Sequence, residues 1–369
     1  MIYALNKKTI VIAGIIALAA ILIGAYFLFR PEPTSPEPTP DPPPVEHSYD
    51  TESSPPPEPP ADDYIKWVEF NVSSEMLQKA YDYDVNSYGQ DIKLDWVELL
   101  AYSVAKNWGN VDRSNLKSID ECAKLLKSGK TIEEITKDLK YYDYYHEAYS
   151  AILSNFLGEY EVEVMENNEK KFVKKYGLKV FSPIAKGYGY SHYDDFGMSR
   201  SYGYQRKHMG NDLLGSVGTP IIAVEGGTIE AMGWNQYGGW RIGIRSDDGL
   251  RYYYYAHLRK NHPYCNRLKE GDKVKAGDVI GYLGMTGYST TENVNNITTP
   301  HLHFGMQLIF NEKQKDGTNQ IWIDVYKLVN LLEKNRSAVV YDEATKEYSR
   351  KYDIREVSVH EGTDEKAPE

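Results

Sequence analysis

Residues 217–258 read VGTPIIAVEGGTIEAMGWNQYGGWRIGIRSDDGLRYYYYAHL. Glycine pairs at 226–227 and 238–239 separate short runs of residues that favour strands. Further turn glycines are Gly249, Gly271, Gly277, Gly281, Gly284 and Gly287. Several short strands with turn signals at close spacing are typical of an all-β sandwich or barrel. We therefore predict this fold class for residues 176–325.

The chain before this region, residues 64–165, reads mainly as helix. Apolar residues recur at helical spacing at Trp96, Leu99, Leu100, Val104 and Trp108. Asp95 is suited to cap that helix, with Glu98 in the capping-box position. Further helices are predicted over residues 118–127, 131–139 and 144–157, and one more from Asp324 to about residue 334. We expect a small all-α domain over residues 63–170.

The first thirty residues predict a membrane anchor. Residues 9–29 read TIVIAGIIALAAILIGAYFLF, an uncharged run that as a helix spans about 31 Å and crosses a bilayer. Lys7 and Lys8 precede it, so residues 1–8 are expected in the cytoplasm and the rest outside the cell membrane. The alternative, a cleaved signal peptide, fits less well because the run is long and ends in bulky residues.

Two further segments are predicted to lie outside the folded domains. Residues 30–62 hold most of the 18 prolines of the chain, which favours an extended extracytoplasmic linker. Residues 336–369 are expected to be a C-terminal extension with a disordered end from Glu356 onward. The β domain itself is assigned to residues 176–335.

Charge and cysteine content exclude several classes of protein. The net charge of the chain is −11, and Lys7, Lys8 and Arg30 make its first thirty residues basic, so the remainder is strongly acidic. A nucleic-acid partner is disfavoured because phosphate binding needs a basic face. Only Cys122 and Cys265 are present, which excludes disulfide-rich scaffolds and Cys-rich zinc sites. We expect two separate thiols, with a single disulfide as the alternative.

Histidines mark the candidate chemistry. Three motifs stand out, namely His208-x-x-x-Asp212, Tyr255-Ala256-His257 and His301-x-His303. On a strand, His301 and His303 project from the same face, which suits a metal site better than a core. A catalytic zinc site keeps three N or O ligands and leaves a position for water. A hydrolase also needs a group that takes the proton of that water.

These motifs resemble the lysostaphin-type, LytM-like zinc endopeptidases of peptidase family M23, over about residues 181–328. The resemblance also covers VGTPIIAV at 217–224, LKEGDKVKAGDVIG at 268–281, TGYS at 286–289 and PHLHF at 300–304. It implies that His208, Asp212 and His303 bind one Zn²⁺ per chain. It implies that His301 and His257 are catalytic and face the attacking water; which of them is the general base stays open.

The same resemblance implies a mainly antiparallel, barrel-sandwich β fold with an open groove, and peptidoglycan stem or bridge peptides as substrate. Two other functions stay open. One is a non-catalytic anchored scaffold or wall-binding module, and the other is a proteinase of soluble peptides. The helical domain is a candidate docking site for an envelope protein. A glycosidase role for Glu98 is disfavoured, since no second carboxylate is suitably placed.

Several residues near the motifs have two interpretations. Residues 291–299, TENVNNITT, read as an inserted surface loop that narrows the groove or contacts substrate. The five tyrosines of residues 188–204 either line the groove or pack at a β edge. Charged residues there either hold substrate or pair on the surface, namely Asp194, Asp195, Arg200 and Arg206. His262 is expected on the surface, and His146 and His192 in structural roles.

Overall fold

The computed structural model describes residues 65–357, apart from residues 203, 266–267, 316 and 318. The predicted anchor at 9–29, the proline-rich linker and the last twelve residues lie outside the described residues. Among the helices that are described, none has both the length and the apolar character needed to cross a membrane.

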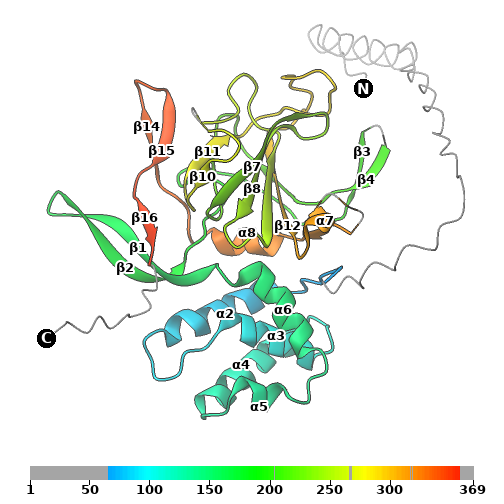
Figure 1. Ribbon diagram of the computed structural model, residues 1–369, viewed down its shortest axis with the longest axis vertical. Helices are drawn as coiled ribbons and strands as arrows, with labels where there is room; N and C mark the ends of the chain where they lie inside the picture. Colours follow the sequence, from blue (N-terminus) through cyan, green and yellow to red (C-terminus); the bar gives the residue numbers. More distant parts are fainter. Residues whose placement is uncertain (1–64, 203, 266–267, 316, 318, 358–369) are drawn as a thin grey trace, which may run out of the picture. The chain divides into compact units, whose positions relative to one another are not determined.

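Five helices form the first folded part (Figure 1), and their bounds are α2 Ser74–Ser87, α3 Trp96–Lys106, α4 Arg113–Lys127, α5 Ile132–Thr136 and α6 Tyr142–Leu153. The predicted cap of α3 is confirmed, because the Asp95 carboxylate accepts the N–H groups of Val97 at 2.7 Å and Glu98 at 3.2 Å. Trp108 was expected on the buried face but is 75% exposed, since α3 ends at Lys106.

The predicted all-α domain ends earlier than expected. Residues 157–178 form an antiparallel hairpin, β1 Leu157–Glu166 and β2 Glu169–Leu178. Strand β16, Ile354–Glu356, pairs with β1 to make a three-stranded sheet. The boundary predicted at 170 was therefore wrong. The alternation of Tyr160, Val162 and Val164 with charged residues is the period-two signal of a strand.

The predicted β domain is built mainly around one seven-stranded sheet. The path runs β10-β7-β8-β9-β12-β13, and β5 also pairs with β12; every pairing between the described strands is antiparallel. The bounds are β5 Asn211–Leu214, β7 Gly227–Asn235, β8 Gly239–Ser246, β9 Arg251–Ala256, β10 Lys273–Val274, β12 His301–Leu308 and β13 Ile321–Ile323. The predicted antiparallel β fold is confirmed.

Shorter elements complete the β domain (Figure 1). They are the hairpin of β3 Ser199–Tyr202 with β4 Tyr204–Lys207, the pair β6 Pro220–Ile222 with β11 Val279–Tyr282, the hairpin of β14 Val339–Asp342 with β15 Glu347–Arg350, and helices α7 Glu312–Lys315 and α8 Tyr326–Leu332. Helix α8 confirms the helix predicted from Asp324. The segment from 336 was expected to be a mere extension, but its first half carries three strands that pair with the rest of the fold or with each other.

One buried core joins the helices to the sheet. A single cluster of buried residues includes Leu77 of α2, Ile244 of β8 and Val329 of α8. The fully buried guanidinium of Arg251 donates to the carbonyl oxygen of Ala151 in α6 at 2.7 Å, and its Nε donates to Glu225 at 2.8 Å. The helices therefore pack against the sheet through a shared core and a buried hydrogen bond. Cys122 and Cys265 are both free thiols, as expected.

Candidate metal centre and groove

Strand register assembles the centre of the site. Strands β5 and β12 are antiparallel neighbours, and their register sets Asp212 opposite His303. Side chains at directly opposite positions of such a pair lie on the same face of the sheet. His208 directly follows β4, Tyr204–Lys207, and begins the short connection to β5, four residues before Asp212. Asp212 and His303 are 91 residues apart in the chain and meet because their strands pair.

His208, Asp212 and His303 form a compact cluster. His208 Nε2 lies 2.8 Å from His303 Nδ1 and 2.9 Å from Asp212 Oδ1, and His303 Nδ1 lies 3.1 Å from the same oxygen. The candidate ligand atoms all lie within 4.8 Å of one another. Two imidazole nitrogens and one carboxylate oxygen match the donor set of a catalytic zinc site with one open position. The cluster therefore fits the predicted metal.

Electrostatics favour the metal-binding protonation states of Asp212 and His303. Burial alone would raise the pKa of Asp212, but hydrogen bonds with His208 and His303 outweigh it and hold that pKa well below its usual range. Burial lowers the pKa of His303, and the neighbouring imidazoles lower it further. A neutral imidazole and an ionised carboxylate are the forms that bind a metal ion.

The two predicted catalytic histidines lie beside this cluster. The ring centres of His257 and His301 are 4.8 Å apart, and His301 Nε2 lies 3.7 Å from Asp212 Oδ1. Nδ1 of His257 lies 2.9 Å from the Thr286 carbonyl, and Nδ1 of His301 lies 2.8 Å from the Thr299 carbonyl. A carbonyl only accepts, so each Nδ1 carries the hydrogen and each Nε2 keeps a free lone pair. Burial lowers the pKa of His257 well below its usual value.

A buried carboxylate behind the cluster was missed by sequence reasoning. Asp195 is 1% exposed, so it is neither a surface partner nor a substrate contact. Its Oδ2 lies 3.1 Å from His208 Nδ1, and Arg200 Nη2 donates to the same oxygen at 2.6 Å. With its hydrogen on Nδ1, His208 has Nε2 free for a metal. No periodic pattern of the sequence links Asp195 to His208. The one hint of a polar site was the pair Asp194-Asp195 within the tyrosine-rich residues 188–204.

A groove of about 670 Å³ opens onto this cluster and is lined by His208, Asp212, His303 and His257. Its walls are rich in aromatic side chains, namely Tyr237, Tyr252, Tyr254, Tyr288 and Trp322. The tyrosine-rich segment divides between both predicted roles. Tyr202 stacks on Tyr288 of the groove, with ring centres 5.2 Å apart, whereas Tyr190 packs against the core.

The remaining predictions have mixed outcomes. None of residues 291–299 lines this groove; Asn293 of that loop accepts from Trp240 Nε1 at 2.9 Å, and the Thr299 carbonyl contacts His301 Nδ1 at 2.8 Å. His192 is structural, as predicted, because its two ring nitrogens contact Asn211 and Asn330 at 2.6 and 3.1 Å. His262 was expected on the surface, but it is half-buried and stacks on Tyr282.

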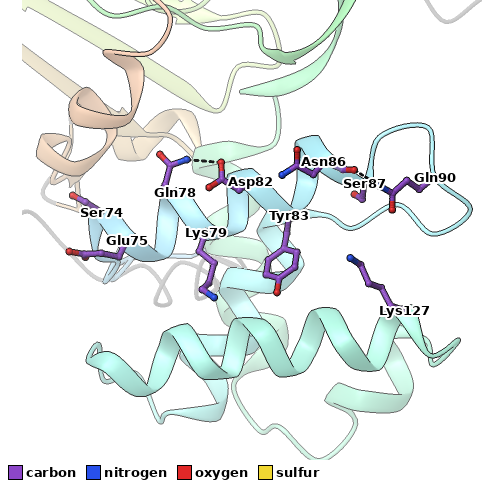
Figure 2. Close-up of a pocket in the computed structure, with 10 residues that line it drawn as sticks. All are labelled: Ser74, Glu75, Gln78, Lys79, Asp82, Tyr83, Asn86, Ser87, Gln90 and Lys127. Carbon is purple, nitrogen blue, oxygen red and sulfur yellow. Dashed lines mark hydrogen bonds between the residues drawn. The ribbon is translucent and has the colours of Figure 1, made fainter.

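A second hollow, of about 780 Å³, lies between α2 and the end of α4 (Figure 2). Figure 2 shows Tyr83 and Lys79 pointing from α2 toward α4, with Lys127 nearby. Lys79 pairs with Asp120, and the hydroxyl of Tyr83 donates to the same carboxylate at 2.8 Å. The carboxylates Glu75 and Asp82 also line this hollow, but among the described residues the one cluster of side chains that could hold a metal ion is His208, Asp212 and His303 in the other groove. The chemistry of the molecule therefore lies in the other groove.

Comparison with known proteins agrees with this geometry. The model of peptidase family M23 matches residues 206–317, a narrower span than the 181–328 expected. The L-Ala–D-Glu endopeptidase of Bacillus subtilis (strain 168) is 39% identical over 117 residues, which is 32% of this chain and 34% of that protein. The glycyl-glycine endopeptidase ALE-1 of Staphylococcus capitis is 42% identical over 120 residues, which is 32% of this chain and 28% of that protein.

The chain is also similar to a solved structure. The catalytic domain of lysostaphin from Staphylococcus simulans is 32% identical, and the match covers 38% of this chain and 92% of that domain with a TM-score of 0.30. The chain spans about a third or less of the length of the two curated relatives above. The three residues of the metal cluster, His208, Asp212 and His303, all lie within residues 206–317, which the family model matches. Residues 206–317 are thus a peptidase family M23 domain, homologous to the lysostaphin-type endopeptidases.

Proposed function

We propose that the protein is a zinc-dependent endopeptidase that hydrolyses peptide bonds in the stem or cross-bridge peptides of peptidoglycan. The observation that carries the proposal is the cluster of His208, Asp212 and His303, which opens onto a groove beside His257 and His301. The relatives named as L-Ala–D-Glu and glycyl-glycine endopeptidases support the reaction class.

The side chains divide the work as follows. His208, Asp212 and His303 hold the metal, which when bound polarises the scissile carbonyl and makes water more acidic. His257 and His301 each keep Nε2 free because Nδ1 contacts a backbone carbonyl, and one of the two accepts the proton of the attacking water. The aromatic walls hold an extended peptide against the open face of the cluster. The proton then passes from histidine to the leaving amine.

The test joins zinc content to wall digestion. The purified chain, His303→Ala, His301→Ala and the control His146→Ala are each given purified peptidoglycan, and new amino groups are counted. We expect about one zinc per chain, as one three-ligand site requires, and release of amino groups by the wild type. His303→Ala should lose zinc, His301→Ala should keep zinc and lose rate, and His146→Ala should retain both.

Two outcomes favour other functions. Zinc binding without digestion of any wall type favours an anchored scaffold or wall-binding module, and absence of zinc removes the mechanism altogether. We also propose that residues 9–29 anchor the chain in the cell membrane, with the peptidase domain on the outer side and the helices free to dock an envelope protein. Protease treatment of intact cells that spares the peptidase domain would contradict that orientation.

A further inference from the structure

The groove is basic, although the chain as a whole is acidic. The formal net charge of the chain is −11, yet basic side chains dominate the groove. The Lys and Arg residues that line it are Arg200, Arg206, Lys207, Arg241 and Lys315. Asp212 is the one acid among the described residues of that lining, and it belongs to the metal cluster. A basic groove in an acidic protein points to an anionic ligand.

Two of these cations already have carboxylate partners. Arg200 donates to Asp195 at 2.6 Å, and Lys315 pairs with Glu230. Arg206 and Arg241 differ, because no described carboxylate pairs with either. Arg206 Nη1 and Arg241 Nε are buried nitrogen atoms without a hydrogen-bond partner among the described residues. A buried donor without a partner is costly, and it becomes favourable when a ligand supplies the acceptor.

The two guanidinium groups share one part of the groove, although they come from different hairpins. Arg206 lies on β4 and Arg241 on β8. Both arginines line the same groove as Tyr254. Burial raises the pKa of the Tyr254 hydroxyl, and its hydrogen bond with Asn235 and then the charges of Arg241 and Arg206 oppose that rise. The ring centre of Tyr254 lies 5.8 Å from that of His303, which places this part of the groove beside the metal cluster.

Aromatic rings hold Arg206 in position. Its guanidinium carbon lies 5.0 Å from the ring centre of Tyr237 and 5.2 Å from that of Tyr288. Such contacts restrict where the guanidinium can lie but do not occupy its N–H groups as hydrogen-bond donors. A planar guanidinium held in this way binds a carboxylate through two parallel hydrogen bonds.

We infer that Arg206 and Arg241 form a carboxylate-binding subsite, which selects peptides with a free carboxylate next to the scissile bond over neutral, glycine-only peptides. The inference rests on the proposed function and narrows its substrate class. A glutamyl residue whose carboxylate is not amidated is the ligand chemistry that this pair recognises. An oligoglycine bridge offers no acceptor of that charge.

The test uses matched peptides and the zinc-loaded full chain. One peptide carries a free glutamyl carboxylate beside the scissile bond, the second is identical but amidated there, and the third is oligoglycine. We expect kcat/KM for the acidic peptide to exceed that for the amidated peptide by about 10-fold or more, since one charge-assisted contact is lost. The difference should lie mainly in KM and shrink as salt is raised.

Variants assign that preference to the two residues. Arg206→Gln and Arg241→Gln should each reduce the ratio of acidic to amidated peptide by about 10-fold. Arg245→Gln is the control, because Arg245 lies on the same strand β8 but pairs with Glu230 and Glu312 outside the groove. It should leave the ratio unchanged. Circular dichroism checks that each variant is folded.

Failure of this inference is distinguishable from failure of the proposed function. Equal rates on the acidic and amidated peptides by the wild type would overturn the carboxylate subsite and leave the peptidase intact. If no peptide is cleaved, the proposed function fails, and calorimetric binding of the same two peptides decides the subsite. Equal affinity for both peptides would then reject it, whereas tighter binding of the acidic peptide that Arg206→Gln abolishes would support it.

Discussion

The Asp195 carboxylate lies 3.1 Å from Nδ1 of His208, and both side chains are buried. The Asp195 backbone carbonyl lies 3.2 Å from the same nitrogen. Both oxygens only accept, so together they fix the hydrogen of His208 on Nδ1 and turn Nε2 toward Asp212 and His303. Asp195 is thus a positioning residue for a metal ligand.

Asp195→Asn should weaken zinc binding by about 10- to 100-fold, because a neutral amide holds the Nδ1 hydrogen of His208 less firmly and no longer raises the basicity of Nε2. Competition with a zinc chelator measures the affinity. Asp194→Asn is the matched control, since Asp194 is 45% exposed and pairs with Lys327 instead. Equal zinc affinity of the two variants would show that Asp195 has no positioning role.

Gly210→Ala should disturb the metal cluster at His303. A Cβ at this position would lie 2.7 Å from His303 Cε1 and 2.7 Å from the carbonyl oxygen of Phe304. The imidazole must move away, so zinc affinity falls and stability drops by about 1–3 kcal/mol. Chelator competition and thermal unfolding measure the two effects. Gly189→Ala is the control, because no atom lies within 4 Å of its added Cβ; similar losses in both variants would contradict the steric account.

Arg251→Met should destabilise the fold by about 3–5 kcal/mol, because it leaves Glu225 and Asp248 without their buried cation. Urea unfolding followed by tryptophan fluorescence measures the free energy of unfolding. Lys346→Met serves as the comparison, since Lys346 and its partner Glu343 are 68% and 81% exposed and surface ion pairs contribute about 0–1 kcal/mol. An equal, small effect of both substitutions would count against a role for Arg251 in joining the helices to the sheet.

Glu98 should make stability fall between about pH 4.5 and pH 7. Burial, and then the charges of Asp95 and Glu133, raise the pKa of Glu98 to about 7 from its usual value of 4.5. The folded state therefore binds the proton more tightly than the unfolded state, so its advantage is present at low pH and is lost as pH rises through that window. Glu98→Gln should flatten the dependence of the unfolding midpoint on pH between 5 and 8.

The control for that experiment is Glu75→Gln. Hydrogen bonds lower the pKa of Glu75, so its titration falls below the window. Its substitution should leave the slope between pH 5 and 8 as in the wild type. A wild-type protein whose unfolding midpoint does not fall over this range would show that Glu98 titrates normally.

Much of the site was predictable because its chemistry is carried by short motifs. The spacing of His301 and His303 on one strand face, together with His208 and Asp212, identified the cluster that the register of β5 and β12 then brings together. Periodicity also identified α3, and the acidic residues Asp95 and Asp324 marked the starts of α3 and α8. These features depend on local spacing, which sequence records directly.

Other features depend on contacts that no local spacing records. Asp195 meets His208 across thirteen residues that include the β3–β4 hairpin, so its role appears only in three dimensions. The hairpin of β1 and β2 was taken for the end of the helical domain, because its outer residues are charged and the preceding segment is strongly helical. The basic pair Arg206 and Arg241 is formed by two separate hairpins.

The hydrogen bond from Arg251 to the Ala151 carbonyl also limits which segments of this protein can be exchanged with those of a relative. If only residues 206–317 were transferred to another protein, β9 would lose its contact with α6 and the sheet would lose α8. The core that contains Leu77 and Val329 would then be exposed. The peptidase segment is therefore not an exchangeable cassette here. A hybrid enzyme that inherits this groove must inherit the helices from α2 onward and the chain through α8 with it.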